Sequence, residues 1–463
     1  MKIEKLLYKS KNVHFSGICG ISMSAIAKHL QNKGYNVSGS DIGLKRGVIE
    51  HNFNNIKLYD KHSQTNLKGV DTLIYTSAIN ENNPELVYAK QNQITLLKRS
   101  QVLGEILSEY KNSIAISGSH GKTTATALLS NVFINAGLDP TVFLGGFDKN
   151  FGNYRLGKSD FAIAEACEYK KNLLDLNTNV VVVLNIDNDH LDSYTDMQEM
   201  VDTFDNFAKN SIAIINADDK SCQKLESLTS ISFGINNLSN YMAKNVEFNG
   251  KGYSFDVIAY GIKLGRINLK INGYHNIYNV LSTISVSQLY HIPFSMQKEA
   301  IESFCGVKRR NEYLGKFCGI DIIADYAHHP KEISAMFKTF DSLNKRYLTV
   351  FQPHTYSRTK LLMNDFITCF NNDKPLIIYK TYPARESYDR GGSAKAIFTN
   401  LLKINKKGVF YSSSKQGIEN IIKSQEKPID FVLFLGAGDI YEVAKEMVQK
   451  PKKMKKRKKI TKS

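Results

Sequence analysis

A glycine-rich stretch at residues 118–124 has the residue types of a phosphate-binding loop. It follows an apolar run at 113–117 and precedes another that ends at Gly137, which predicts a strand, a loop and a helix. Backbone N–H groups at such a helix start bind anions, Lys122 can reach the β- and γ-phosphates, and the Thr123 hydroxyl can ligate Mg²⁺. The loop is one residue shorter than the general pattern, so a surface Gly/Lys turn is the alternative. We expect the phosphates of a nucleotide to be held by Gly118, Ser119, His120, Gly121, Lys122, Thr123 and Thr124.

Two further apolar runs end in side chains that could bind a metal ion. The run at 161–164 leads to Glu165, and the run at 180–184 leads to an acidic turn that contains His190. Continuous apolar runs are typical of buried parallel strands, whose carboxyl ends open onto one crevice. Glu165 and His190, with Thr123, are therefore candidate Mg²⁺ ligands. A solvated loop acid and a capping histidine are the alternatives.

The first part of the chain has the outline of a nucleotide-binding Rossmann fold. The expected strands are 12–16, 36–40 and 72–75. Asp41 closes the second of these strands and Ser77 follows the third, so small polar groups lie at strand carboxyl ends. Cys19 and Ser22 stand where the dinucleotide fingerprint has glycine, which argues against hydride transfer. A nucleotide diphosphate is the ligand that this pattern indicates.

The rest of the chain predicts a β-rich insert and then a second doubly wound domain. Short alternating strands with Asn/Gly turns fill 211–265, and a helix follows from about 275 to 290, where Asn276 faces a base or caps the helix. Four apolar strands then end in polar clusters, which indicates a working crevice. These strands are expected at 320–324, 348–351, 376–379 and 431–435.

Length and charge indicate a multidomain protein with an appended basic tail. The 463 residues suggest about three domains of ~150 residues each. Of the net charge of +17, Lys450–Ser463 carries nine Lys/Arg and no acid, which leaves 17 − 9 = +8 for the rest. We expect this tail to be a disordered, solvated extension, and a contact to RNA or an anionic membrane is the alternative.

The chain is expected to work in the cytoplasm. No signal-peptide pattern starts it, and no run of eighteen apolar residues occurs. The six cysteines show no paired spacing, which is typical of reduced thiols and indicates neither a disulfide framework nor a zinc site. These cysteines are Cys19, Cys167, Cys222, Cys305, Cys318 and Cys369.

Taken together, the motifs resemble the Mur ligase family, and within it the enzymes that join L-alanine to UDP-N-acetylmuramate. The resemblance runs from about Asn12 to Ile440, and the shortened phosphate loop is that family's own version. The motifs are His14-Phe15-x-Gly17, Gly118–Thr124, Glu165–Glu168, Asp189–Asp192, His275-Asn276, Gly306–Arg310, Asp325–Pro330, Phe351–His354 and Gly436–Asp439.

This resemblance implies an α/β architecture of three domains and a basic tail. A Rossmann-like UDP-sugar domain is expected at 1–110, a P-loop ATPase domain at 111–307, a Rossmann-like amino-acid domain at 308–449 and the tail at 450–463. The implied reaction starts when the lactyl carboxylate attacks the γ-phosphate of ATP. L-alanine then displaces phosphate from the acyl phosphate, and positioning and charge neutralisation supply most of the catalysis.

Residue roles follow from the resemblance by motif. The catalytic residues are Lys122, Glu165 and His190, and Thr123, Glu165 and His190 are the implied Mg²⁺ ligands. Beyond the phosphate loop, the implied ATP contacts are Asn276, Arg309 and Asp325. The implied UDP-sugar residues are Gly17, Gly20, Met23, Ser24, Asp41 and Ser77. The implied L-alanine residues are Tyr326, His354 and Arg358, of which Arg358 suits the carboxylate because a guanidinium pairs with it bidentately.

Two departures from the family pattern and three rival functions bear on this interpretation. Cys19 replaces a family glycine, and Thr355 replaces a family arginine beside the alanine pocket. No lysine lies between His190 and Lys209, so we predict none of the carbamylated lysine used by sister ligases. The rivals are a recycling ligase that adds a whole tripeptide, a P-loop NTPase that binds RNA through its tail, and a dehydrogenase. No specific nucleic acid is expected, and the oligomeric state is not predicted.

Overall fold

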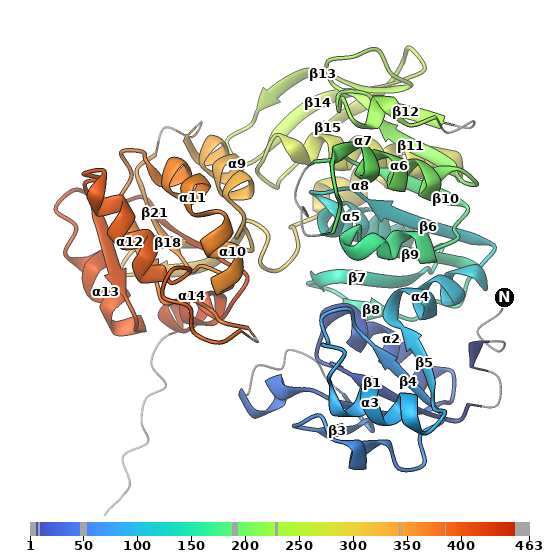
Figure 1. Ribbon diagram of the computed structural model, residues 1–463. Helices are drawn as coiled ribbons and strands as arrows, with labels where there is room; N and C mark the ends of the chain where they lie inside the picture. The colour runs from blue at the N-terminus through green and yellow to red at the C-terminus, as the bar shows by residue number, and fades with distance from the viewer. Residues whose placement is uncertain are drawn as a thin grey trace, which may run out of the picture. The chain divides into compact units, whose positions relative to one another are not determined.

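The computed structural model divides the chain into two compact units, Met1–Lys308 and Arg309–Ser463. It describes residues 6–7, 10–46, 53–187, 193–226, 230–341, 343, 345–384 and 386–449. His190 and the basic tail lie outside these residues. The first unit contains two sheets and the second contains one, as the ribbons in Figure 1 show. No helix in the described ranges is long and apolar enough to span a membrane.

The first sheet is fully parallel and has the strand order β3-β2-β1-β4-β5. This order confirms the predicted Rossmann-like fold, and the three predicted strands are present at the predicted residues. Its strands are β1 (Asn12–Ser16), β2 (Asn36–Ser40), β3 (Lys57–Tyr59), β4 (Thr72–Tyr75) and β5 (Thr95–Lys98). Its helices are α2 (Ile21–Asn32), α3 (Pro84–Gln91) and α4 (Arg99–Ser108), with 3₁₀ turns η1 (Ile42–Arg46) and η2 (Gln64–Leu67).

The second sheet has ten strands in the order β15-β14-β13-β12-β11-β10-β6-β9-β7-β8. Its middle is parallel. Of the segment 211–265 predicted as a β-rich insert, β11 and β12 continue the parallel sheet, and β13, β14 and β15 form an edge whose strands pair antiparallel to one another. The strands are β6 (Asn112–Ser117), β7 (Thr141–Asp148), β8 (Gly152–Arg155), β9 (Phe161–Glu165), β10 (Val180–Val183), β11 (Ile212–Asn216), β12 (Ser230–Gly234), β13 (Tyr241–Phe248), β14 (Tyr253–Ala259) and β15 (Ile262–Asn268). The helices are α5 (Lys122–Asn135), α6 (Met197–Ala208), α7 (His275–Leu289) and α8 (Phe294–Ser303), with 3₁₀ turns η3 (Tyr169–Asp175) and η4 (Cys222–Lys224).

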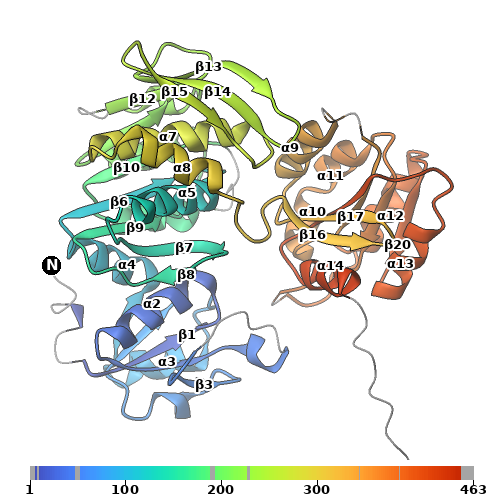
Figure 2. The same ribbon diagram turned by 180° about the vertical axis from the view of Figure 1, so that it is seen from behind.

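Both faces of this second sheet are buried, which explains the uninterrupted apolar runs of its strands. In β10, Val180 and Val182 pack into one hydrophobic cluster with residues of α5, α7 and α8. Val181 and Val183 point the other way, into a cluster that includes residues of α6. Figure 2 shows α5, α7 and α8 lying together over the sheet.

The cluster on the α6 side also contains the core of the first sheet. Val13 and Phe15 of β1 belong to it, as do Phe143 of β7 and Phe204 of α6. Polar contacts cross the same boundary, since the Asn153 amide donates to the Ile21 carbonyl at 2.7 Å. The two sheets of the first unit therefore share one continuous hydrophobic core.

The second unit is built on a six-stranded sheet in the order β16-β17-β21-β18-β19-β20. The four predicted strands are present and pair in parallel, whereas β16 is an antiparallel edge strand. The strands are β16 (Glu312–Phe317), β17 (Ile320–Asp325), β18 (Tyr347–Phe351), β19 (Leu376–Tyr379), β20 (Val409–Ser412) and β21 (Phe431–Leu435). The helices are α9 (Pro330–Asp341), α10 (Tyr356–Leu361), α11 (Met363–Phe370), α12 (Ala394–Lys403), α13 (Lys415–Lys423) and α14 (Ile440–Val448).

A substitution at Gly104, in the middle of α4, tests the close packing between the domains of the first two sheets. A Cβ atom at this position would lie 2.0 Å from the backbone oxygen of Asp175, so only glycine lets the two segments approach. Gly104→Ala should lower the free energy of unfolding by about 1–3 kcal/mol, although alanine normally stabilises a helix relative to glycine. Thermal denaturation measures the change, with Ser108→Ala on the exposed end of α4 as control. A stabilised Gly104→Ala protein would contradict the close approach.

Candidate functional site

The phosphate loop connects β6 to α5, as the sequence predicts. Gly118 and Gly121 have φ values of 134° and 84°, which side chains other than glycine rarely adopt. Asn185, beyond β10, fixes the loop: its backbone oxygen accepts from the Ser119 N–H at 3.1 Å, and its side-chain oxygen accepts from the His120 N–H at 2.8 Å. The loop is therefore held by the neighbouring strand end, so its conformation is set before any anion binds.

The ammonium group of Lys122 is held within the loop by a buried carboxylate. Its Nζ atom donates to the Ser119 oxygen at 3.0 Å and to Glu168 Oε1 at 3.0 Å, and it also contacts the Gly118 carbonyl. The Glu168 side chain is 1% exposed. Burial alone favours the neutral amine, but the facing carboxylate of Glu168 raises the pKa of Lys122. Lys122 therefore carries its positive charge beside the loop.

Sequence reasoning did not assign a role to Glu168. Glu168 lies three residues after Glu165, just beyond the end of the same strand. This position could have indicated a role, since acidic residues that follow such strands share the crevice of the phosphate loop. In the structure the two carboxylates have different partners: Glu168 accepts a hydrogen bond from the Lys122 ammonium group, and Glu165 accepts one from the Thr123 hydroxyl.

Thr123 and Glu165 lie together, as expected for residues that hold Mg²⁺. The Thr123 hydroxyl donates to Glu165 Oε1 at 2.8 Å, and the Gly145 N–H donates to Glu165 Oε2 at 2.6 Å. A hydroxyl and a carboxylate oxygen at this spacing are ligands of the type that Mg²⁺ prefers. Within the described residues no group of three or more His, Cys, Asp or Glu side chains is placed to hold a metal. His190, the third expected ligand, lies outside the described residues.

The start of α7 reaches the phosphate loop. A Cβ atom on Gly121 would lie 2.8 Å from the side-chain oxygen of Asn279, so the helix and the loop are in close contact. The Asn279 amide donates to the Asn276 oxygen at 2.9 Å, and the Asn276 amide donates to the Asn272 carbonyl at 2.7 Å. Asn276 therefore contacts Asn279, which in turn lies against the loop. Its role towards ATP stays a prediction.

The glycine loop of the first sheet is closed by Asp41. Gly17 has φ 84°, and its N–H donates to the Ser40 carbonyl at 2.8 Å. The Asp41 carboxylate accepts from the backbone N–H of Cys19 at 3.1 Å and from that of Gly43 at 2.8 Å. Burial and the nearby Asp41 raise the pKa of the Cys19 thiol to about 12, so it stays neutral. Cys19 is thus accommodated in the loop without adding charge.

The other predicted UDP-sugar residues occupy two environments. Gly20 precedes α2 and donates its N–H to the Gly17 carbonyl at 3.1 Å, and Ser77 follows β4 at the same edge of the sheet. Met23 and Ser24 are buried, and the Ser24 hydroxyl accepts a hydrogen bond from Asn153 at 2.9 Å. Their side chains pack between the two sheets here, and their assignment to the UDP-sugar stays a prediction.

A buried carboxylate that sequence reasoning missed lies beneath the glycine loop. Glu85 of α3 accepts from the Ser16 hydroxyl at 2.5 Å and from the Ser40 hydroxyl at 2.7 Å, which join the ends of β1 and β2. Imidazole nitrogens of His62 and His14 lie 3.1 and 3.4 Å from its oxygens. Burial would raise the pKa of Glu85, but hydrogen bonds from both histidines lower it below its usual range. Glu85 lies in the first turn of a helix, and nothing in the sequence around it indicates that it joins two strand ends.

In the second unit, the three residues predicted for L-alanine lie together. Arg358 Nη1 donates to the His354 carbonyl at 3.2 Å and lies 3.3 Å from its Nδ1. His328 links Tyr326 to His354: the centroid of its ring lies 5.7 Å from that of His354 and 5.3 Å from that of Tyr326. Burial, with the charges of His328 and Arg358, lowers the pKa of His354 to about 3. A neutral imidazole and a guanidinium therefore lie side by side.

Arg309 and Asp325 of the second unit have partners of their own. The Arg309 guanidinium lies 4.4 Å from the centre of the Tyr441 ring and 3.5 Å from Glu442 of α14. Asp325 accepts from two backbone N–H groups, those of Asn311 and Ala327, each at 2.7 Å, and burial raises its pKa. Their predicted contacts with ATP stay predictions.

Comparisons with known proteins agree over the whole chain. Three family models match: the Mur ligase family catalytic domain at 12–111, the Mur ligase middle domain at 116–287, and the Mur ligase glutamate ligase domain at 309–438. The UDP-N-acetylmuramate–L-alanine ligase of Clostridium beijerinckii is 39% identical over 95% of this chain and 98% of its own. That of Clostridium tetani is 41% identical over 93% and 96%.

Solved structures give the same result for the fold. The crystal structure of the UDP-N-acetylmuramate–alanine ligase of Thermotoga maritima matches with a TM-score of 0.76 at 27% identity, covering 94% of this chain and 98% of its own. A murein peptide ligase from Psychrobacter arcticus matches with a TM-score of 0.69 at 19% identity over 94% and 98%, which shows a common fold only. On its sequence, its domain models and its architecture, the chain belongs to the Mur ligase family.

Proposed function

We propose that this protein is the ATP-dependent ligase that joins L-alanine to the lactyl carboxylate of UDP-N-acetylmuramate, a step of peptidoglycan precursor synthesis in the cytoplasm. The observation that carries the proposal is the pair of ordered carboxylates beside the phosphate loop, Glu168 on Lys122 and Glu165 on Thr123. Relatives that bear this activity in their names, at 39–41% identity over nearly the whole chain, support the choice of substrates.

The chemistry needs an activated carboxylate, and the loop supplies the charge to make one. A lactyl carboxylate oxygen attacks the γ-phosphorus of ATP, the bond to the bridging oxygen breaks, and ADP leaves. Lys122, which is paired with Glu168, would stabilise the negative charge that accumulates on the phosphates. The amine of L-alanine then attacks the acyl carbon, loses a proton, and expels inorganic phosphate from the tetrahedral intermediate.

Mg²⁺ fits the donors beside the loop. Thr123 and Glu165 would hold the ion on the ATP phosphates, and His190 would hold a second near the acyl phosphate. Bound there, Mg²⁺ neutralises the charge of the transferred phosphoryl group. Glu165 is preset for this task because the Gly145 N–H and the Thr123 hydroxyl orient its two oxygens.

The alanine pocket is assigned to the cluster around Arg358. The guanidinium would pair with the amino-acid carboxylate, and the neutral His354 beside it adds no competing charge. Its neighbours Tyr326 and His328 contact each other edge to face, with ring centroids 5.3 Å apart.

Phosphate release from Mg-ATP and UDP-N-acetylmuramate tests the proposed reaction. We expect release only when L-alanine is also present, because the acyl phosphate needs an amine acceptor. Parallel assays replace L-alanine with the murein tripeptide or omit the acceptor. Release with the tripeptide alone would move the assignment to the recycling ligase, and release without UDP-sugar or acceptor would indicate a general NTPase.

Lys122→Ala tests the charge on the phosphate loop. Turnover should fall by ~10²-fold or more, because the variant cannot stabilise charge on the transferred phosphoryl group. The change also leaves Glu168 buried without its cation, so thermal unfolding is measured in parallel. The double variant Lys122→Ala/Glu168→Gln removes that unpaired charge, and its turnover should stay low while its stability recovers. Near-normal turnover of either protein would refute the role.

Arg358→Ala separates the amino-acid site from the nucleotide site. The KM for L-alanine should rise by about tenfold or more, because a bidentate partner of the carboxylate is lost, while the KM for ATP stays within about twofold. Steady-state kinetics with each substrate varied in turn measure both constants, with Arg358→Lys as the charge-preserving comparison. Equal increases in both constants would assign Arg358 to the nucleotide instead.

A further inference from the structure

The turn after Glu168 has an unusual backbone conformation at two lysines. Lys170 (φ 51°, ψ 33°) and Lys171 (φ 56°, ψ 25°) are both left-handed, although neither is a glycine. Consecutive left-handed residues with long side chains are disfavoured, because the Cβ atom crowds the backbone. Such a conformation persists only where neighbouring contacts impose it, and it concentrates at functional sites.

Contacts on one side of the turn impose this conformation. The Lys171 N–H donates to the Glu168 carbonyl at 2.9 Å, and the Tyr194 hydroxyl donates to the same carbonyl at 2.6 Å. The Lys171 ammonium forms an ion pair with Glu199 of α6. Lys171 thus holds the turn against its own domain, whereas the side chain of Lys170 has a different partner.

Lys170 is directed to the carboxyl edge of the first sheet. Its side chain is exposed, and its Nζ atom donates to the Ser77 carbonyl at 3.2 Å, just beyond the end of β4, while lying 5.6 Å from the ring of Tyr169. The only contact that links Lys170 to the first sheet among those described is therefore made by a cation with a backbone oxygen.

Ser77 lies at the point of the sheet where a nucleotide is expected to bind. In the order β3-β2-β1-β4-β5, successive connections leave β1 in opposite directions, so β1 and β4 border the topological switch point. A second cation reaches the same edge, since Arg99 Nη1, at the end of β5, donates to the Ser22 hydroxyl after the glycine loop at 2.9 Å. Two cations in this crevice favour an anionic ligand.

We propose that Lys170, supplied by the central domain, is a binding residue for the diphosphate of the nucleotide sugar in the first domain. The inference rests on the proposed function for the identity of that ligand. Lys170 follows Glu168, the partner of Lys122, by two residues in the chain, and its ammonium group contacts the end of β4 in the first sheet. Its hydrogen bond to Ser77 holds it at the crevice until a phosphate oxygen takes the place of the carbonyl.

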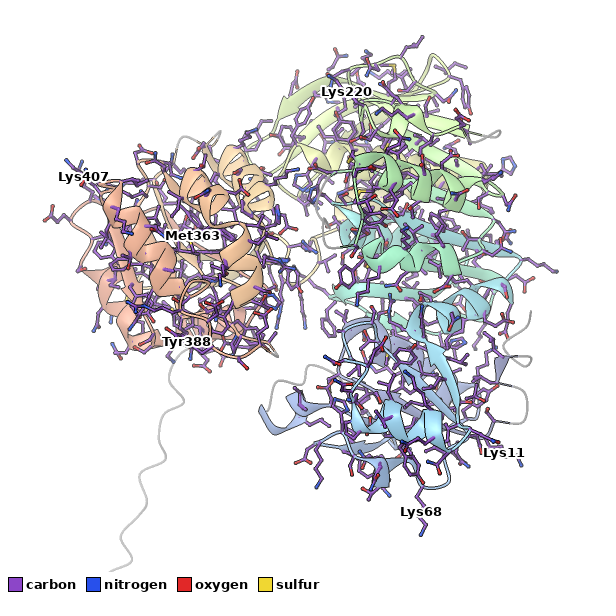
Figure 3. All side chains as sticks on the ribbon, in the orientation of Figure 1. Lys11, Lys68, Lys220, Met363, Tyr388 and Lys407 are labelled. Atoms are coloured by element: carbon purple, nitrogen blue, oxygen red, sulfur yellow. The ribbon has the colours of Figure 1, made fainter. Side chains whose placement is uncertain are left out.

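Calorimetric binding of UDP and of UDP-N-acetylmuramate to the full chain tests the proposal. Lys170→Ala should weaken both ligands by about tenfold or more, because a charge-assisted hydrogen bond is lost, and Lys170→Arg should restore most of the affinity. Binding of the non-hydrolysable ATP analogue AMP-PNP should stay within about twofold. Lys68→Ala is the matched control, since Lys68 is also exposed but precedes β4 at the amino edge of the sheet, where it points outward (Figure 3).

The outcomes separate this inference from the proposed function. If wild-type protein binds neither UDP nor UDP-N-acetylmuramate, the proposed function fails and the inference fails with it. If wild-type protein binds both and Lys170→Ala binds UDP equally well, the inference alone is overturned. Weaker binding of UDP-N-acetylmuramate with unchanged binding of UDP would place Lys170 on the sugar or its carboxylate, and would also overturn the diphosphate assignment.

Discussion

A buried carboxylate needs a cation, and in this protein that requirement organises the catalytic region. Glu168 is almost fully buried, and Lys122 supplies the compensating charge from the phosphate loop. The same pairing raises the pKa of Lys122, whose ammonium group also contacts the Gly118 carbonyl of the loop. Removing either partner would strand a charge in the protein interior, which costs far more than an exposed ion pair contributes. Stability and catalysis therefore depend on the same two side chains.

The first sheet uses a comparable device at its own functional edge. Glu85 draws the ends of β1 and β2 together through Ser16 and Ser40, and Asp41 closes the glycine loop through backbone N–H groups. In the second sheet, the loop after β6 is held instead by an amide residue, since Asn185 accepts hydrogen bonds from the Ser119 and His120 N–H groups. The loops at these carboxyl edges are thus preorganised, which reduces the conformational entropy lost when a nucleotide binds.

Sequence patterns were sufficient for the predicted strands, the phosphate loop and the grouping of Tyr326, His354 and Arg358, because those features depend on local periodicity, glycine and strand-end placement. They were insufficient where a side chain reaches across the fold. The pairing of Lys122 with Glu168 depends on the packing of β6 beside β9, and the role of Glu85 depends on four segments meeting below the glycine loop. Met23 and Ser24 show the same limit, since their positions near a loop did not predict that their side chains pack between two sheets.

The core shared by the two sheets of the first unit has a consequence for folding during synthesis. Ile26 of α2 belongs to this shared cluster, and α2 packs against β7 and β8 of the second sheet. While translation proceeds, this side of the first domain stays uncovered until β7 and β8 have emerged from the ribosome. Exposed apolar surface of this kind promotes aggregation and attracts chaperones. The nascent first domain therefore completes this part of its packing only after β7 and β8 of the central domain have been synthesised.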